Sequence, residues 1–126
     1  MTTDPISLSL AALRATLSEP VSATKVGHSP GASLVLVALV DLDRVVPHRL
    51  EEARYTAHCY AATKGEALNL AMRVRKVLID IDPHAVSGFV ITESFVGGPY
   101  DLPDEDTREQ RFIITYSLLY YETGGH

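Results

Sequence analysis

Two segments of the chain carry apolar residues at the spacing of an amphipathic helix. The first opens with Asp4-Pro5, which is typical of a helix start with Asp4 as the N-cap and Pro5 in the first helical position. We expect this helix to end at Glu19-Pro20, because the residue before a proline disfavours the helical conformation. The predicted buried stripe consists of Ile6, Leu10, Leu13 and Leu17.

The second helix has a stronger start signal. Thr63-Lys64-Gly65-Glu66 has the form of a capping box, in which Thr63 and Glu66 satisfy each other's free backbone amides. The helical pattern continues to Asp82-Pro83, where we expect the helix to end. The predicted buried stripe consists of Ala67, Leu70, Ala71, Val74, Val77, Leu78 and Ile81.

Three strands are predicted between these helices. Residues 23–28 favour a short strand, and residues 33–42 a second one whose unbroken apolar run from Leu34 to Val40 indicates burial on both faces. One face would meet the helices, and the other either more of this chain or a neighbouring subunit. Residues 52–61 then alternate. One predicted face holds Arg54, Thr56, His58 and Tyr60, and the other holds Ala53, Tyr55, Ala57, Cys59 and Ala61, which leave room for a helix.

Two more strands follow the second helix. Residues 86–96 predict a strand with Phe89, Ile91 and Phe95 on one face. Residues 111–122 predict a closing strand with apolar residues at both parities, which indicates a strand that is central or covered on both sides.

The order of these elements predicts a single domain, residues 1–126, of the α+β class. We expect a mixed, mostly antiparallel sheet of about five strands with two helices packed on one face. Flexible loops are expected at about residues 43–50 and 97–109, and a frayed C-terminus at residues 123–126.

Composition excludes several classes of function. Eleven Lys and Arg against sixteen Asp and Glu give a formal net charge of −5, without the basic cluster that a DNA-binding surface needs. The single cysteine, Cys59, allows no internal disulfide and no CxxC site, which fits a reducing cytoplasm. The N-terminus does not resemble a signal peptide, and the run from Leu34 to Val40 is shorter than the roughly 20 residues of a membrane span. We therefore expect a soluble protein.

Candidate chemistry is sparse. The five histidines, His28, His48, His58, His84 and His126, fall in different predicted elements without the spacing of a metal-binding pair, so no metal site is expected. His58 and Cys59 are neighbours on a strand and point to opposite faces, which excludes a nucleophile and base. We expect no cofactor, no catalytic residue and no enzyme.

Charged residues form two notable groups. The predicted loop near residue 100 concentrates the carboxylates Asp101, Asp104, Glu105 and Asp106 but lacks the ligand spacing of an EF-hand loop. The second helix carries a basic face of Arg73, Arg75 and Lys76. Both groups are ordinarily solvated surface, and their functional interpretation is a pair of complementary interaction surfaces.

The chain resembles the tail terminator, or tail completion, proteins of siphophages. The resemblance rests on the opening Asp4-Pro5-Ile6-Ser7-Leu8, the passage from strand 54–61 into helix 66–71, the late acidic loop 98–104 and the closing strand start Arg111-Phe112-Ile113-Ile114. It implies a homohexameric ring that caps the head-proximal end of the phage tail tube, stops its polymerisation and presents a surface for the head–tail connector. It also implies a virion protein assembled in the host cytoplasm, through which DNA passes without specific binding.

The charged groups fit such a ring in two ways. Head-to-tail contact needs two different complementary patches on one subunit, and the basic helix face and the acidic loop are one candidate pair. Alternatively, the acidic loop lines the lumen and keeps DNA from adhering during ejection.

Two alternative functions remain open. Within the same class, the chain is another neck or head–tail connector protein. In a different class, it is a small cytosolic ligand-binding or enzymatic α+β domain, with Arg54, His58 and Tyr60 as the residues that would line its pocket.

Overall fold

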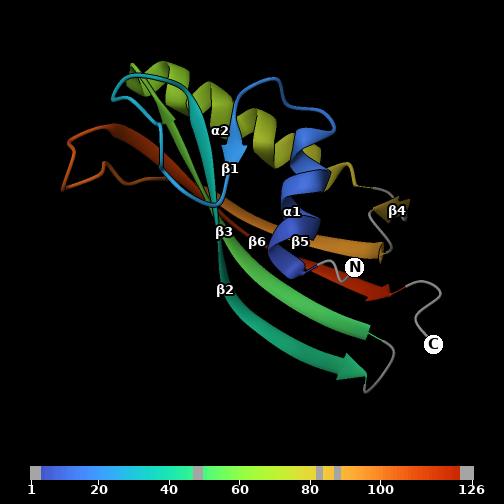
Figure 1. The fold of residues 1–126 in the computed structure, drawn as a ribbon. Coiled ribbons are helices and arrows are strands. Elements are labelled where there is room, and N and C mark those ends of the chain that lie inside the picture. The colour runs from blue at the N-terminus through green and yellow to red at the C-terminus, as the bar shows by residue number, and fades with distance from the viewer. Residues whose placement is uncertain (1–3, 47–49, 82–83, 87–88, 123–126) are drawn as a thin grey trace.

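Eight elements make up the fold of the computed structural model, which describes residues 4–46, 50–81, 84–86 and 89–122 (Figure 1). In chain order they are α1 (Pro5–Arg14), β1 (Val21–Ser22), β2 (Leu34–Val46), β3 (Leu50–Ala61), α2 (Lys64–Ile79), β4 (His84–Val86), β5 (Phe89–Asp101) and β6 (Gln110–Glu122).

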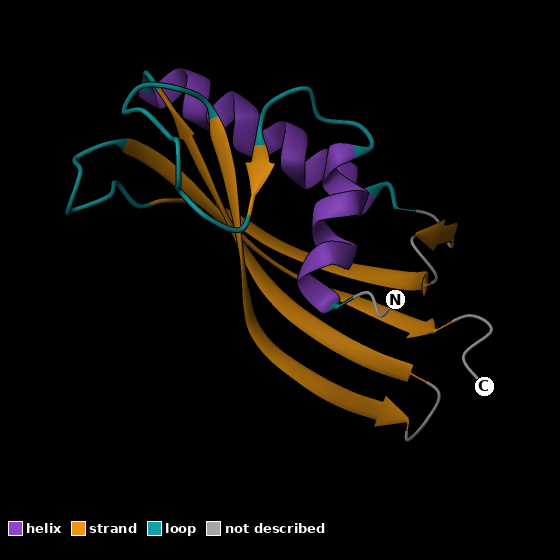
Figure 2. Ribbon diagram, in the orientation of Figure 1, coloured by secondary structure: helices purple, strands orange, loops and turns teal. Residues whose placement is uncertain are grey.

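The strands form one sheet in the order β1-β2-β3-β6-β5-β4. Four long strands make its body, and the two- and three-residue strands β1 and β4 lie at its margins. Only the β1–β2 pair is parallel. Both helices pack on the same face of the twisted sheet (Figure 2) and share one core with it. This confirms the predicted α+β class, with a mixed, mostly antiparallel sheet and two helices on one face.

Helix α1 begins as predicted and ends earlier. The Asp4 side chain accepts a hydrogen bond from the backbone N–H of Ser7 at 2.7 Å. The helix stops at Arg14 because the chain turns back toward β1, where the Arg14 Nε donates to the Val21 carbonyl at 2.9 Å. Its buried residues are Leu8, Ser9, Ala12 and Leu13, whereas Ile6, Leu10 and Leu17 are only partly buried. The predicted stripe is therefore confirmed at Leu13, while Leu10 and Leu17 pack only at the edge of the core. It missed Ser9, which is buried because its hydroxyl bonds that of Tyr116.

Helix α2 agrees closely with its prediction. The Thr63 hydroxyl accepts a hydrogen bond from the Glu66 backbone N–H at 3.2 Å, which caps the first turn. Five of the predicted stripe residues are fully buried, and Val77 and Ile81 are partly buried. The helix ends at Ile79, and Asp82-Pro83 lies outside the described residues.

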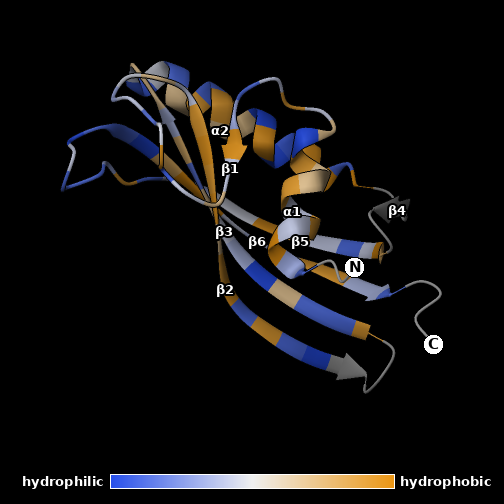
Figure 3. Cartoon of the chain, in the orientation of Figure 1, coloured by the Kyte–Doolittle hydropathy of each residue, from blue (hydrophilic) through white to orange (hydrophobic). Residues whose placement is uncertain are grey.

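The alternation predicted for residues 52–61 is confirmed in strand β3. On β3 the face with Ala53, Ala57 and Cys59 is buried in the core beneath the helices, and Arg54 on the opposite face is exposed. In Figure 3, hydrophilic and hydrophobic bands alternate along β2 and β3.

Three further predictions, on strands and loops, are wrong. Residues 23–28 form no strand, since β1 covers only Val21–Ser22. Residues 43–46 belong to β2 and residues 97–101 to β5, although both were predicted as loop. Asp43-Arg44 and Gly97-Gly98-Pro99 favour a loop in the sequence, but backbone pairing with the neighbouring strand extends both strands past the predicted ends. Residues 47–49 and 123–126 lie outside the described residues.

Irregular pairing changes which side chains are exposed. A register shift between Ile91 and Glu93 moves Phe95 away from the helices, so Phe95 does not share a face with Phe89 and Ile91 and is 53% exposed. On β2, Ala38 and Val40 point to the helix-free face and are exposed, so the described part of this chain does not cover that face. The other predicted cover, a neighbouring subunit, stays a prediction. The closing strand β6 is central, as predicted, although Thr115 and Tyr121 remain exposed.

Candidate interaction surfaces

Two loops, residues 23–33 and 102–109, cover one end of the helix-free face. Tyr60 belongs to that face, yet only 1% of it is exposed. The Lys25 Nζ lies 4.4 Å from the centroid of the Tyr60 ring, and the His28 ring lies 5.6 Å from it. The loops are therefore held on the sheet by packing as well as by the polar contacts between them.

A buried carboxylate, Glu109, joins these two loops. Its Oε2 lies 2.7 Å from the His28 Nε2, and its Oε1 accepts a hydrogen bond from the Lys25 Nζ at 3.2 Å. Burial alone would raise the pKa of Glu109, but hydrogen bonds from His28, Thr107 and Lys25 hold that pKa below its ordinary value. The carboxylate therefore stays ionised and paired inside the protein.

Asp104 has a similar supporting role. Its Oδ2 accepts a hydrogen bond from the Tyr60 hydroxyl at 3.1 Å, and its Oδ1 accepts one from the Asp106 backbone N–H at 3.0 Å. Burial works to raise the pKa of Asp104, whereas bonds from the Thr107 and Asp106 amides, Tyr60 and the Arg111 charge lower it overall. Asp104 thus shapes its own loop and ties it to β3.

The predicted acidic group is consequently divided between different roles. Asp101 lies in β5 rather than in the loop, and its Oδ2 is 2.6 Å from the Lys64 Nζ at the start of α2. Glu105 and Asp106 are exposed at the tip of the loop. Of the four carboxylates in this acidic group, these two make no ion pair with another described residue.

The predicted basic face lies on α2, away from the acidic loop of the same chain. Arg73 pairs with Glu19, and the Lys76 Nζ lies 2.7 Å from the Asp80 carboxylate. Both cations are more than half exposed, so water screens these pairs and each adds little stability. Arg75 is partly buried.

Apolar side chains extend along the same exposed side of α2. Leu68, Met72 and Ile79 follow one another at helical spacing and are 38%, 46% and 49% exposed. They flank the basic residues and make this part of the helix surface apolar as well as charged. The sequence signals this only as apolar residues outside the predicted buried stripe.

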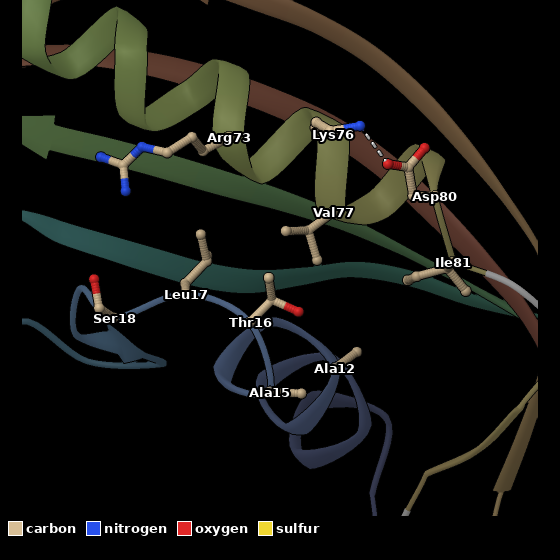
Figure 4. Close-up of a pocket in the computed structure, with 10 residues that line it drawn as sticks. All are labelled: Ala12, Ala15, Thr16, Leu17, Ser18, Arg73, Lys76, Val77, Asp80 and Ile81. Carbon is tan, nitrogen blue, oxygen red and sulfur yellow. Dashed lines mark hydrogen bonds and ion pairs between the residues drawn. The ribbon is translucent and has the colours of Figure 1, made fainter.

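A groove of about 490 Å³ separates α2 from the end of α1. Leu17, Val77 and Ile81 make its apolar lining, and Arg73 and the Lys76–Asp80 pair lie along its α2 side (Figure 4). A second, more open hollow of about 490 Å³ lies on the helix-free face. Val40, Phe95 and Thr115 line it together with Arg54.

The predicted rival pocket does not form. Arg54 pairs with Asp41 at 2.7 Å and Glu52 at 3.0 Å, Tyr60 lies beneath the loops, and His58 lies between Thr56 and Arg111. Burial, and then the Arg111 charge, lower the pKa of His58. These three side chains therefore occupy separate environments.

Cys59 lies on the buried face of β3, opposite His58, as predicted. Burial raises the pKa of its thiol to about 12, which keeps it protonated and unreactive. Among the described residues no three His, Cys, Asp or Glu side chains are grouped to hold a metal ion. His48 and His126 lie outside those residues, and the His84 side chain is not described.

Within the described part of the chain, no helix combines the length and the apolar character needed to cross a membrane. Comparison with models of known protein families and with curated protein sequences finds no match.

Proposed function

We propose that this protein is a structural subunit that works by self-assembly, and specifically a tail-terminator-like protein of a tailed bacteriophage. The observation that carries the proposal is the exposure of large apolar side chains on two surfaces. Val40 and Phe95 are 63% and 53% exposed on the helix-free face, and Met72 and Ile79 are about half exposed on α2. Apolar patches of this kind on a folded domain mark contact surfaces.

The charged residues support a structural role. The cluster around Glu109 and Asp104 joins two loops to the sheet, and its polar atoms bond one another. Among the described side chains, no buried nitrogen or oxygen lacks a hydrogen-bond partner. The cluster is thus explained by support of the fold.

In the proposed assembly, copies form a hexameric ring at the head-proximal end of the tail tube. The ring stops polymerisation of the tube protein and offers its other side to the head–tail connector. Such a ring uses head-to-tail contacts, which require two different patches on each subunit. The exposed carboxylates Glu105 and Asp106 and the net charge of −5 suit a ring through which DNA passes without binding.

Electron microscopy of phage lysates tests this function directly. A phage with an early stop codon in the gene is expected to give overlong, headless tail tubes beside filled heads, because polymerisation has lost its stop. Supplying the intact gene in trans is the control and should restore infectious particles. Tails of normal length that fail to join heads would indicate a neck or connector protein, and normal particles would refute a structural role.

One observation favours the alternative of a small ligand-binding domain. The groove between α1 and α2 has the volume of a small-molecule site and an apolar lining with Arg73 at its side. Native mass spectrometry of the purified protein decides this point. A stoichiometric bound small molecule, lost when Val77 is replaced by a bulky charged residue, would support the ligand-binding function.

A further inference from the structure

The sheet has two long strand edges without a partner strand. On one side of β2, strand β1 pairs only with Val35 and Leu36. On one side of β5, strand β4 pairs only with residues 89–91. Among the described residues, no strand therefore covers residues 37–46 of β2 or residues 92–101 of β5 on those sides. Figure 2 shows the end of β2 as the outermost strand of the sheet.

Exposed apolar side chains lie along both edges. Val40 on β2 and Phe95 and Tyr100 on β5 are all more than half exposed, and all three point to the helix-free face. Soluble proteins ordinarily protect open edges with charges, prolines or bulges. Here Pro99 and the register shift beside it protect the last part of β5, and the charges on β2 begin at Asp41. Register shifts also fall between Leu39 and Asp41 of β2, which leaves Val40 without a partner on β3, and between Ile91 and Glu93 of β5. Residues 37–39 of β2 and 94–97 of β5 carry neither charge nor proline and follow a regular register, so the strands remain suited to pairing beside these shifts.

The two edges also have matching directions. Each step from β2 to β3, from β3 to β6 and from β6 to β5 is antiparallel. Three such steps leave β2 and β5 running in opposite directions. When β2 of one copy lies beside β5 of the next in a head-to-tail array, the new pair is therefore antiparallel and continues the pattern of the sheet.

We propose that copies of this chain join edge to edge, with β2 of one copy adding to β5 of the next. Backbone hydrogen bonds would join the strands, and Val40 and Phe95 would meet on the helix-free face as a cross-strand apolar pair. This inference rests on the proposed self-assembly and names its contact. It does not require the basic face of α2 to meet the acidic loop.

Pairing of unlike edges is favoured over self-pairing by charge. Two copies of β2 side by side would bring together Asp41 and Asp43 from both chains, and like charges on paired strands are destabilising. Beside β2, the corresponding part of β5 instead presents Thr92, Ser94 and Val96, with Glu93 as its single acid. A head-to-tail contact also leaves one free β2 edge and one free β5 edge at the two ends of the array, so a ring can close.

Two single substitutions and their mixture test the contact. Val40→Lys disables the β2 edge, and Phe95→Lys disables the β5 edge. Each places a charge where the partner strand would bury it, while both positions are exposed enough in the single chain to preserve the fold. Val26→Lys is the matched control, because Val26 is 92% exposed and lies on a loop away from these edges. Sedimentation velocity and native mass spectrometry measure assembly, and circular dichroism verifies folding.

The expected result is complementation. Wild type and Val26→Lys assemble, whereas each edge variant alone shows a dissociation constant raised at least roughly tenfold. An equimolar mixture of the edge variants forms heterodimers and nothing larger, because only one intact edge of each kind remains.

Other patterns would overturn the inference in distinguishable ways. Dimers of Phe95→Lys alone would mean that β2 pairs with itself. Edge variants that assemble like wild type, or a mixture that stays monomeric while wild type assembles, would move the contact to another surface and leave the proposed self-assembly standing. A wild-type protein that is monomeric at every concentration would refute strand pairing, while tail morphology in the stop-codon phage would still decide the proposed function.

Discussion

Among single residues, Glu109 combines full charge with almost complete burial. Its side chain is 5% exposed and contacts Lys25 and His28 from a loop more than eighty positions earlier in the chain. A buried carboxylate persists only where such partners compensate for its lost hydration. The contact between the two loops therefore depends on this one side chain.

Replacing Glu109 with glutamine is expected to lower the free energy of unfolding at neutral pH by roughly 1–3 kcal/mol. The amide keeps the shape but removes the charged acceptor of His28 and leaves Lys25 with only its longer ion pair to Asp104, at 3.7 Å. Because the pKa of Glu109 is lowered from 4.5, wild type keeps this advantage above about pH 4.5 and loses it as the pH falls through the folded pKa. Urea denaturation across this range measures the difference. The exposed Glu105→Gln should change stability by less than about 0.5 kcal/mol, and an equal loss there would contradict the assignment.

A second prediction at this scale concerns His58. Its pKa lies below the ordinary 6.5 because burial and the Arg111 charge disfavour the imidazolium. Below about pH 6.5 the unfolded chain therefore binds a proton more readily than the folded chain, and the free energy of unfolding declines as the pH falls. In His58→Gln this part of the decline should disappear. Urea denaturation from about pH 7.5 to 5 measures the free energy of unfolding of both proteins. The advantage of wild type over the variant should shrink on acidification, and an advantage that stays constant would refute the prediction.

Local residue roles were predictable and long-range ones were not. The caps Asp4 and Thr63 were read correctly because a cap acts on amides two or three positions away. The contact between His28 and Glu109 was not predicted, because nothing near His28 in the sequence indicates a partner 81 positions away. The supporting role of Asp104 was missed for the same reason, since its hydrogen-bond donor, the Tyr60 hydroxyl, comes from a strand 44 positions earlier in the chain.

At the scale of elements, irregular pairing limits what alternation can predict. Helix α2 and strand β3 follow their periods without interruption, so their buried faces were predicted correctly. Along β5, one register shift reverses the parity of the residues from Glu93 to Gly97, a second shift restores it at Tyr100, and the sequence pattern alone locates neither. The prediction that Phe95 shares a face with Phe89 and Ile91 was consequently wrong, and Phe95 lies on the helix-free face instead.

The second register shift in β5 yields a prediction about glycine. Gly98 has a φ of +97°, and a Cβ there would lie 2.8 Å from the Ile113 carbonyl oxygen of the neighbouring strand. Gly98→Ala should therefore cost about 1–2 kcal/mol or more in stability. Gly65→Ala is the matched comparison, because a Cβ there meets no atom within 4 Å and alanine suits a helix better. Thermal unfolding should show opposite shifts for the two variants, and equal shifts would contradict this account of the strand.

For the whole molecule, the two faces of the sheet differ in how far they are covered. The helices cover one face of the sheet, the loops at residues 23–33 and 102–109 cover one end of the other face, and the rest of that face stays open. The unbroken apolar run of β2 indicated a second covering layer. Among the described residues no such layer covers Ala38 and Val40, and this exposure supports the proposed self-assembly.

Association of folded copies predicts that thermal stability depends on protein concentration. Because the assembled state contains only folded chains, mass action shifts the unfolding equilibrium toward it as the concentration rises. A tenfold increase in protein concentration stabilises the folded state by at most about 1.4 kcal/mol per copy. This raises the Tm of a domain of this size by a few degrees. Differential scanning calorimetry at two or more concentrations measures this for wild type and for Val40→Lys. The Tm of wild type should rise and that of the variant should stay constant, since a monomer unfolds independently of concentration. A rise of equal size in both proteins would place the contact away from β2, and a constant wild-type Tm would mean that folded copies do not associate.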